Sequence, residues 1–432
     1  MNRTNYIGDL KGLSDSTKVI VDGWVQESRV LGNIAFLILR DREGIVQVTL
    51  FKKQLGSDKF KLLCNLPRES VVEVTGIVKK NESVSLGFEI IQDKIEILNI
   101  ARSPLPLGII DKVNTDLDTR LNSRFLDLRK PEIQVMFKIK STILESIRNT
   151  LIDNDFIEIH TPKIVAAATE GGTDLFHVQY FENDAYLVQS PQLYKQIMMS
   201  AGFDRVFEIA PAFRAEEHNT IRHLNEFVSI DVEMSFCDDE DAMKLLELVI
   251  ANAILHVNKK RKKELEVLGL QWAVPELPFK RYDYEFLRSF VNESGLNMEF
   301  GADFSADALA IIGAKYPSFY FIKNWPLETR AFYVYPDLSN PKFGKAFDLQ
   351  YGDREITSGA QRNHDYNSLK NALISKKLNP DNFEFYLKAF EYGMPPHAGW
   401  AIGLERLTMV LSNAKNIREV SLFPRDRRRI VP

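Results

Sequence analysis

The first hundred residues contain short runs in which apolar and polar positions alternate, separated by Gly, Asp and Asn. Such runs, rich in β-branched and aromatic side chains, predict strands with one buried face. The predicted strands cover residues 19–21, 35–39, 46–50, 71–74 and 88–91, and a helical stretch, 58–64, falls between the third and the fourth. This order favours a five-stranded barrel of the oligonucleotide-binding type, although a small barrel without a ligand has the same strand count.

A linker follows this first region. The segment 103–108 contains two prolines and a glycine, which interrupt both helices and β-ladders. We therefore expect a first domain over residues 1–103, a linker over 104–130 and a second domain over 131–432.

The second region contains both periodicities. Apolar residues at helical spacing predict a long amphipathic helix over 131–153, and the segment 156–162 after it is predicted to be a strand that ends in a proline. Further strands are expected over 185–189, 205–209, 226–234, 319–322 and 345–351, and further helices over 192–201, 239–259, 368–377, 380–392 and 404–411. This arrangement is typical of an α+β domain with a largely antiparallel sheet.

The composition of the chain argues against several classes of protein. The 432 residues are 45% apolar and 26% charged, with a net charge of −4, which argues against a protein that binds nucleic acid over its whole surface. The sequence has no apolar run of about 18 residues and no signal-peptide core, so we expect a cytoplasmic protein with no membrane segment. Cys64 and Cys237 are far apart and lack metal-ligand neighbours, which argues against a disulfide framework or a zinc site.

The segment 213–227 carries charges that no periodicity explains. Arg214 and Arg222 are permanently charged forks that can hold phosphate oxygens bidentately, and His223 adds a third donor. Phe227 offers a flat face to an adenine ring. The pattern therefore predicts a site for a nucleoside triphosphate, whereas a solvated hairpin with alternating charges would be favoured if the segment stood alone.

Three separated motifs link this segment to a known family. The first comprises 125–131, the long helix and the strand ending at Pro162; the second is 214–227; the third is 399–406 with 416–419 and 422–426. With the amino-terminal barrel, they make the chain resemble the class II aminoacyl-tRNA synthetases, and over essentially its whole length the aspartyl type of archaea and eukaryotes. The resemblance implies an antiparallel-sheet class II catalytic domain after an OB-fold anticodon-binding barrel, and a homodimer whose interface includes the first motif.

The resemblance also implies an ATP site. Arg214 is the implied catalytic residue, bridging the substrate carboxylate and the α-phosphate, while Arg222 and His223 reach the outer phosphates. Glu216 accepts from the adenine amino group, and the ring lies between Phe227 and Arg406. The implied nucleotide-binding residues are Arg214, Glu216, Arg222, His223, Leu224, Phe227, Glu355, Gly403 and Arg406.

The segments 189–195 and 356–362 resemble the aspartate-specific versions of two further motifs. Lys195 and Arg362 can converge on a side-chain carboxylate, whereas asparagine would turn an amide NH₂ toward a cation. In isolation, Lys195 would be interpreted as an exposed helix lysine and Arg362 as part of a salt bridge at a strand end. By resemblance, the aspartate-binding residues are Glu170, Gln192, Lys195, Arg214, Ser358 and Arg362, and Glu170 contacts the α-amino group of the substrate with help from Gln192. Glu170 lies in a glycine-rich loop that would close as a lid, although the same glycines also suit a tight turn.

A magnesium site is implied next to the phosphates. Asp348 and Glu355 are seven residues apart, so they reach one cavity only if Gly352 marks a turn or a bulge. Carboxylate oxygens suit Mg²⁺, whose octahedron is completed by water and phosphate. The resemblance makes Glu355 and Ser358 ligands, with Asp348 assisting, whereas two acids alone are more often surface charges.

Three barrel residues match the anticodon readers of the family. Phe36 would stack on a base, and Gln47 and Glu89 would read base edges, although a Phe among Leu and Ile is usually a core residue. Archaeal members restricted to the aspartate tRNA carry Trp and Lys where this chain has Gln26 and Ser85. This departure predicts relaxed discrimination between the aspartate and asparagine tRNAs.

The expected activity is ATP- and Mg²⁺-dependent ligation of L-aspartate to tRNA(Asp), and also to tRNA(Asn), through an aspartyl-adenylate. The alternatives are an asparaginyl-tRNA synthetase, a tRNA-independent ligase of the same fold that makes asparagine, and an inactive RNA-binding paralogue. The last requires a broken active-site motif, yet Arg214, Arg362 and Arg406 are all present.

Overall fold

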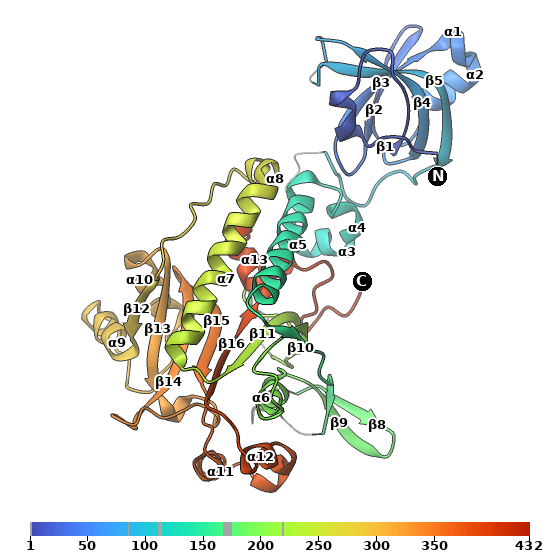
Figure 1. Cartoon of the computed structure of the whole chain (residues 1–432). Coiled ribbons are helices and arrows are strands. Elements are labelled where there is room, and N and C mark those ends of the chain that lie inside the picture. The colour runs from blue at the N-terminus through green and yellow to red at the C-terminus, as the bar shows by residue number, and fades with distance from the viewer. Residues whose placement is uncertain (1, 85, 111–114, 167–174, 218–219) are drawn as a thin grey trace. The chain divides into compact units, whose positions relative to one another are not determined.

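The computed structural model describes residues 2–432 except 85, 111–114, 167–174 and 218–219, and it forms two compact units, residues 1–114 and 115–432 (Figure 1). The second unit begins inside the expected linker. Arg124 explains why, because its guanidinium donates to the carbonyl oxygens of Glu419 at 2.8 Å and Leu422 at 3.0 Å, which joins α4 (Arg124–Asp127) to the carboxy-terminal part of the chain.

The first unit contains a closed five-stranded barrel with strand order β1-β2-β3-β5-β4. The strands are β1 (Lys18–Leu31), β2 (Ile34–Arg40), β3 (Ile45–Phe51), β4 (Val71–Lys80) and β5 (Phe88–Asn99). Helices α1 (Lys52–Leu55) and α2 (Ser57–Cys64) lie between β3 and β4 in the chain. Alternation places Ala35, Leu37 and Leu39 in the barrel interior and Phe36 on the outer face, where it is half-buried. The predicted barrel and its helical insertion are confirmed.

An eight-stranded sheet forms the centre of the second unit, in the order β12-β13-β14-β15-β16-β11-β10-β6. Its strand pairs are antiparallel except β12–β13 and β10–β6, as the predicted largely antiparallel sheet requires. The strands are β6 (Ile157–Glu158), β10 (Arg205–Phe213), β11 (Glu226–Ser235), β12 (Lys280–Asp283), β13 (Phe319–Pro326), β14 (Phe343–Tyr351), β15 (Arg354–Gln361) and β16 (His397–Gly403). A smaller sheet contains β7 (Ile164–Val165), β8 (His177–Tyr180) and β9 (Asn183–Leu187).

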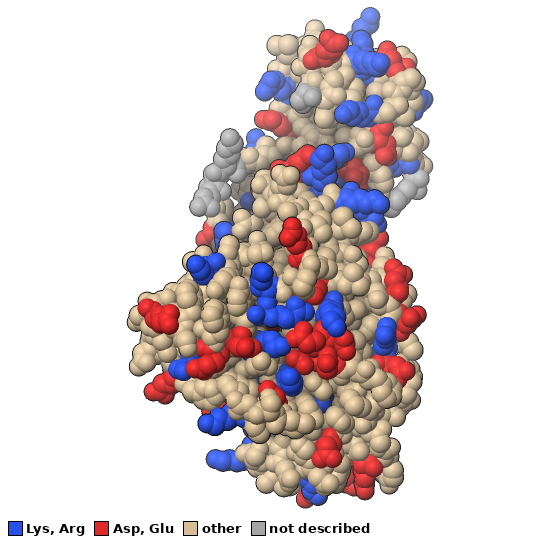
Figure 2. Space-filling view, turned by 60° about the vertical axis from the view of Figure 1, so that its left-hand side comes forward, with Lys and Arg blue, Asp and Glu red and all other residues tan. Residues whose placement is uncertain are grey.

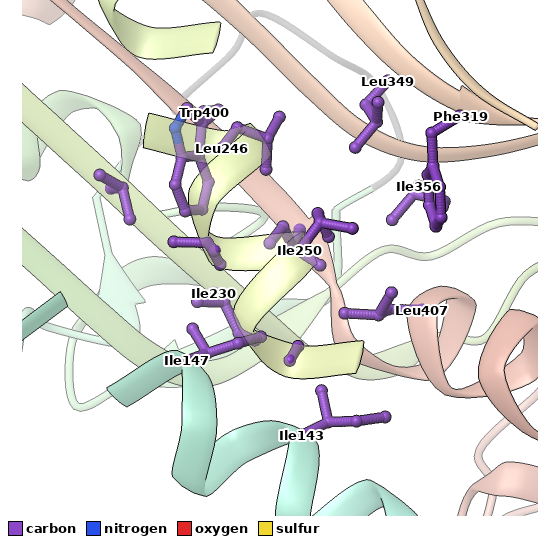
Figure 3. Packing of buried hydrophobic residues seen from close by; sticks show 14 of the residues in the cluster. Ile143, Ile147, Ile230, Leu246, Ile250, Phe319, Leu349, Ile356, Trp400 and Leu407 are labelled. Atoms are coloured by element: carbon purple, nitrogen blue, oxygen red, sulfur yellow. The ribbon is translucent and has the colours of Figure 1, made fainter. Parts of the chain in front are cut away.

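Helices α5 (Pro131–Ile152), α7 (Asp239–Lys260) and α13 (Leu404–Ser412) pack against one face of this sheet. Ile143 and Ile147 of α5 and Leu246 and Ile250 of α7 meet the sheet side chains around Trp400 in one buried cluster (Figure 3). The opposite side of the unit is covered by a second buried cluster that includes residues of α6 (Gln192–Ser200), α9 (Tyr284–Glu293), α10 (Ala306–Lys315), α11 (Tyr366–Ser375) and α12 (Glu384–Glu391). The remaining helices are α3 (Leu117–Asn122) and α8 (Lys262–Val267).

The sheet differs from the sequence-based expectations in one strand that is shorter than expected and in three strands, β12, β15 and β16, that were not expected. The strand expected over 156–162 is limited to Ile157–Glu158, although the amide of Thr161 still bonds a sheet residue by donating to Glu208 Oε1 at 2.8 Å. Strand β16 was not predicted, because Gly399, Ala401 and Gly403 have little β-propensity of their own and pair through their neighbours β11 and β15.

The surface of the protein carries mixed charges. On the face shown in Figure 2, basic and acidic side chains lie side by side, as expected from the net charge of −4. Within the described residues, no helix is both long enough and apolar enough to cross a bilayer.

Candidate active site

The alternation of side chains along β11 places polar residues on the face of the sheet that borders the site. On β11, Ile230 and Val232 pack into the helical core, so Ser229, Asp231 and Glu233 face the opposite side, where all three are buried. The residues of β16 that pair with them are Gly403, Ala401 and Gly399. These small side chains leave space above the middle of the sheet.

Polar residues continue across this face in one cross-strand row. Asp348 pairs with Ser358, which pairs with Ala401, which in turn pairs with Asp231. The residue beyond Asp231 in this row is Glu208 on β10. Directly opposed residues point to the same face of a sheet, so the row brings carboxylates from three strands to one surface.

One cavity adjoins this row. It is lined by Ser229, Ile356, Ser358, Ala401, Glu405, Ile417 and all nine predicted nucleotide-binding residues: Arg214, Glu216, Arg222, His223, Leu224, Phe227, Glu355, Gly403 and Arg406. Six of these nine come from the segment 214–227, which connects β10 to β11 or opens β11. The structure therefore brings the predicted nucleotide-binding set together.

Most cations of the cavity are held by carboxylates. Arg406 Nη1 lies 3.0 Å from Glu355 Oε1, and Arg222 Nη2 lies 2.8 Å from Asp353 Oδ2. The guanidinium carbon of Arg214 lies 5.4 Å from the centre of the Phe227 ring. These pairs hold Arg222 and Arg406 beside the cavity. Because partly exposed ion pairs are weak, little free energy is needed to replace them by contacts with a ligand.

His223 is neutral near pH 7. Burial lowers its pKa, Glu216 opposes this shift, and the charges of Arg406 and Arg214 add to it. Its Nδ1 lies 2.7 Å from Thr220 Oγ1 and 3.7 Å from Glu216 Oε2. A neutral imidazole can still offer one N–H to a phosphate oxygen.

The two cations predicted for the amino-acid side chain meet at a buried carboxylate, Glu233. Arg362 Nε donates to Glu233 Oε1 at 2.9 Å, and Lys195 Nζ lies 3.3 Å from Glu233 Oε2 and 3.1 Å from Asp231 Oδ1. Lys195 is only 1% exposed, so it is not a solvated helix lysine. Arg362 does form an ion pair, at the position where β15 ends.

Glu233 and Asp231 were not predicted as site residues. Burial raises the pKa of Glu233, but the charges of Arg362 and Lys195 outweigh burial, and the net direction is downward. The carboxylate therefore remains ionised at neutral pH. The signal in the sequence was the placement of Ser229, Asp231 and Glu233 at alternate positions in a strand that is otherwise apolar.

Helix α6 carries two of the predicted aspartate-binding residues, Gln192 and Lys195. Gln192, Lys195 and Gln196 lie three and four positions apart and are all buried, so they share one helix face. Gln192 Nε2 donates to Gln196 Oε1 at 2.9 Å. Glu170, the other residue expected to bind the substrate's amino group, lies outside the described residues, as do the rest of 167–174.

The predicted magnesium ligands lie on the β14–β15 hairpin. Gly352, with φ of +55°, forms the turn, and the register shifts between Leu349 and Gln350, as the seven-residue spacing required. Ser358 Oγ donates to Asp348 Oδ1 at 2.6 Å. Burial raises the pKa of Asp348 to about 7, Arg330 opposes this shift and the nearby Glu355 adds to it.

This donor set fits a hard divalent cation. A buried carboxyl with another carboxylate nearby is poorly compensated by Arg330, whose Nη1 lies 3.6 Å from Asp348 Oδ2. Among the described residues, no cluster of three or more Asp, Glu, His or Cys side chains could hold a metal unaided. A cation here would need phosphate and water oxygens as well, which is typical of Mg²⁺.

The predicted anticodon readers lie on the outer face of the barrel. Glu89 accepts from Gln47 Nε2 at 2.9 Å, from Asn81 Nδ2 at 2.8 Å and from the Thr49 hydroxyl. Thr49 pairs with Phe36 across β2 and β3, so the ring and the carboxylate share this surface. Burial raises the pKa of Glu89, but these three donors outweigh it, and the carboxylate remains ionised.

Of the two residues expected to set tRNA discrimination, the structure describes Gln26. Gln26 lies at a bulge of β1 beside a cavity lined by Arg68, Glu69 and residues of 103–110. Its Oε1 is buried without a hydrogen-bond partner among the described residues. Ser85 is outside the described residues.

Comparisons with known proteins agree with this geometry. Residues 116–427 match the tRNA synthetases class II (D, K and N), and residues 19–98 match the OB-fold nucleic acid binding domain. An aspartate–tRNA(Asp/Asn) ligase of Methanocaldococcus jannaschii is 53% identical over 430 residues, which cover 100% of this chain and 98% of the relative. An aspartate–tRNA(Asp) ligase of Thermoplasma acidophilum is also 53% identical, over 432 residues and 100% of both chains.

A solved structure covers the same length. The asparaginyl-tRNA synthetase of Pyrococcus horikoshii, complexed with asparaginyl-adenylate, matches with a TM-score of 0.95 and 32% identity over 100% of both chains. The family match covers more than half of the chain, the relatives match along its whole length, and the predicted nucleotide-binding residues line one cavity. The chain therefore belongs to the class II aminoacyl-tRNA synthetases of the D, K and N group, with an OB-fold domain before the catalytic domain.

Proposed function

We propose that the chain ligates L-aspartate to tRNA in an ATP-dependent reaction through an aspartyl-adenylate. The observation that carries this proposal is the buried group of Lys195, Arg362, Asp231 and Glu233 on the same sheet face as the nucleotide cavity. The curated relatives at 53% identity carry aspartate ligase names, in agreement with this chemistry.

Selection of aspartate over asparagine follows from the cations. The β-carboxylate of aspartate accepts from Arg362 and Lys195, in place of part of their present bonding to Glu233. An asparagine amide would need a carboxylate free to accept its NH₂ group, but Lys195 and Arg362 together already compensate Glu233 and Asp231. This argument separates the chain from the asparaginyl enzyme that it resembles in fold.

Adenylate formation needs no protein nucleophile. The α-carboxylate of aspartate attacks the α-phosphorus of ATP and pyrophosphate leaves, so the residues act by positioning and by charge stabilisation. Arg214 bridges the attacking carboxylate and the α-phosphate, and Arg222 and His223 bind the outer phosphates. The adenine ring lies between Phe227 and Arg406, and Glu216 accepts from its amino group.

Magnesium would be held by Glu355 and Ser358, with Asp348 assisting through its bond to Ser358. The ion supplies positive charge that neutralises the phosphates. Glu355 would share its carboxylate between the ion and Arg406, which it contacts at 3.0 Å.

We propose that both tRNA(Asp) and tRNA(Asn) are charged. The surface that reads the anticodon contains Phe36, Gln47 and Glu89. At position 26 this chain has Gln, whereas the members restricted to the aspartate tRNA have Trp. The two curated relatives above differ in their named tRNA range at equal identity, so identity alone does not decide the range.

A homodimer is part of the proposal. Phe125, Ile152 and Ile157, in the segment of the first motif, are 60%, 52% and 48% exposed in the single chain. We propose that these side chains are covered by a second copy of the chain. Light scattering at micromolar concentration should therefore give twice the mass of the chain.

Amino-acid-dependent exchange between ATP and labelled pyrophosphate tests the first step. L-aspartate should support exchange and L-asparagine should not, and the reverse result would establish the asparaginyl alternative. Charging of purified tRNA(Asp) and tRNA(Asn) transcripts tests the second step and its range. Exchange without charging of either tRNA would favour the tRNA-independent ligase.

A further inference from the structure

Four connected hydrogen bonds, three of them buried, run from His397 at the start of β16 to Gln192 on α6. His397 Nδ1 lies 2.8 Å from the carbonyl oxygen of Pro395, and His397 Nε2 lies 2.8 Å from Gln196 Nε2. Gln196 Oε1 then receives Gln192 Nε2 at 2.9 Å and the Tyr386 hydroxyl at 3.0 Å. Gln196, Tyr386 and His397 are 0% exposed and Gln192 is 4% exposed.

The carbonyl oxygen of Pro395 determines which atom donates and which accepts in each of the following hydrogen bonds. A backbone carbonyl only accepts, so the proton of the neutral His397 ring must be on Nδ1, and Nε2 must accept. The partner of Nε2 is therefore the NH₂ group of Gln196, which turns the oxygen of that amide toward Gln192.

The same logic determines the side chain of Gln192. Gln196 Oε1 can only accept, so Gln192 must present its NH₂ group to it. The amide oxygen of Gln192 is then the end that remains for another ligand. Lys195, on the same helix face, reaches Asp231 and Glu233, so Gln192 belongs to the wall of the amino-acid site.

We propose that His397 and Gln196 are positioning residues that hold the Gln192 amide with its oxygen toward the α-ammonium group of the amino-acid substrate. This inference deepens the proposed function and rests on it. An ammonium group has three donors and no acceptor, so it is bound by the oxygen end of an amide and repelled by the NH₂ end. Without the chain of bonds, the Gln192 amide can rotate by 180° at little cost.

Because His397 is neutral near neutral pH, the donor and acceptor roles in these hydrogen bonds do not change there. Burial lowers its pKa to about 4, although Glu233 acts in the opposite direction and so does the bond to Pro395. A protonated ring would present a second N–H to Gln196 and reverse the order of donors.

The test compares L-aspartate with succinate, which differs from it by the missing amino group. In the full-length wild type with ATP absent, calorimetry or competition should show a clear preference for aspartate. Gln196→Met and His397→Phe should reduce this preference by roughly 10- to 100-fold, the loss expected for one hydrogen bond to a charged group, and leave succinate binding unchanged.

Tyr386→Phe is the matched control. It removes one donor to Gln196 Oε1 but leaves the bonds from His397 to Gln196 and from Gln192 to Gln196, so the preference should change by less than about threefold. In the variants that lose the preference, the KM for ATP should stay as in the wild type.

A double-mutant cycle decides between positioning and general packing. Gln192→Met removes the amide itself, and adding Gln196→Met to it should cause no further loss of preference if Gln196 acts through Gln192. Additive losses would overturn the proposal, as would equal loss of aspartate and succinate binding in the single variants. His397→Phe provides the second route if Gln196→Met does not fold.

Failure of the proposed function would be visible separately. If the wild type binds asparagine and not aspartate, the aspartate assignment is wrong. The same variants are then compared on asparagine and its deamino analogue succinamate, because both amino acids carry the ammonium group that the chain of bonds is inferred to read.

Discussion

Arg362 and Glu233 form a buried fork in which Nε lies 2.9 Å from Oε1 and Nη2 lies 3.3 Å from Oε2. Neither side chain exceeds 5% exposure, and Lys195 approaches the same carboxylate from the other side. Burying two cations is tolerable only because Glu233 and Asp231 compensate them. The two cations are thus held at the place where the side chain of the substrate is proposed to bind.

Removal of one cation should damage both stability and activity. Lys195→Met leaves two buried carboxylates with only Arg362 to compensate them, so the unfolding free energy should fall by about 3 to 5 kcal/mol. Aspartate-dependent pyrophosphate exchange should be lost as well. Urea unfolding measures the first effect, and Lys244→Met on the exposed face of α7 is the control, because its pair with Asp241 is solvent-exposed and contributes little to stability. Equal stability losses would contradict the compensation.

Gly399 is required by its closeness to Glu233. A Cβ atom at position 399 would lie 2.3 Å from Glu233 Oε2 and 2.1 Å from the carbonyl oxygen of Val232. Gly399→Ala should therefore move Glu233 or β11 and destabilise the protein by about 1 to 3 kcal/mol. A Cβ at Gly403, on the same strand, meets only Arg406 side-chain atoms at 3.6 Å or more, so Gly403→Ala should change the unfolding free energy by less than half as much. Thermal and urea unfolding of both variants compare them.

Arg214→Ala should abolish most of the first chemical step. Loss of one preorganised charge donor costs about 3 to 4 kcal/mol of transition-state stabilisation, so kcat for pyrophosphate exchange should fall by about 100- to 1000-fold. The measurement is exchange at saturating ATP and aspartate. If the exchange rate returns to the wild-type value at saturating ATP and aspartate, Arg214 contributes to substrate binding alone.

Acid should destabilise the protein through His397. Burial lowers the pKa of this ring from an ordinary value near 6.5 to about 4, so the unfolded chain binds a proton at a pH at which the folded chain does not. The resulting loss of stability is absent above about pH 7.5 and grows as the pH falls from 6.5 to 4, where it levels off at about 3 kcal/mol. The difference in unfolding free energy between the wild type and His397→Phe should follow this curve. A constant difference from pH 7.5 to 4 would refute it.

Glu89→Gln should separate the two reaction steps. The substitution disturbs the bonds from Gln47 and Asn81 on the barrel, whereas adenylate formation takes place in the other unit. We expect tRNA charging to fall at least tenfold through kcat/KM, with pyrophosphate exchange unchanged. Charging that stays normal would show that Glu89 only supports the barrel.

The sequence by itself determined the elements whose signal is local. The five barrel strands, the long helix that begins at Pro131 and the turn at Gly352 follow from periodicity and backbone chemistry, both of which are properties of short segments. The motif residues of the nucleotide cavity were also identified, because 214–227 is a continuous segment.

Only the tertiary structure decided which charges meet. Lys195 reaches Asp231 across 36 positions of sequence, and Arg362 reaches Glu233 across 129, through packing of α6 and β15 that no local pattern specifies. The strand β16 is likewise stabilised by its neighbours, since Gly399 and Ala401 carry little strand signal. The direction of the Gln192 amide depends on His397, 205 positions away along the chain, because hydrogen-bond polarity is passed on only between groups that the fold brings into contact.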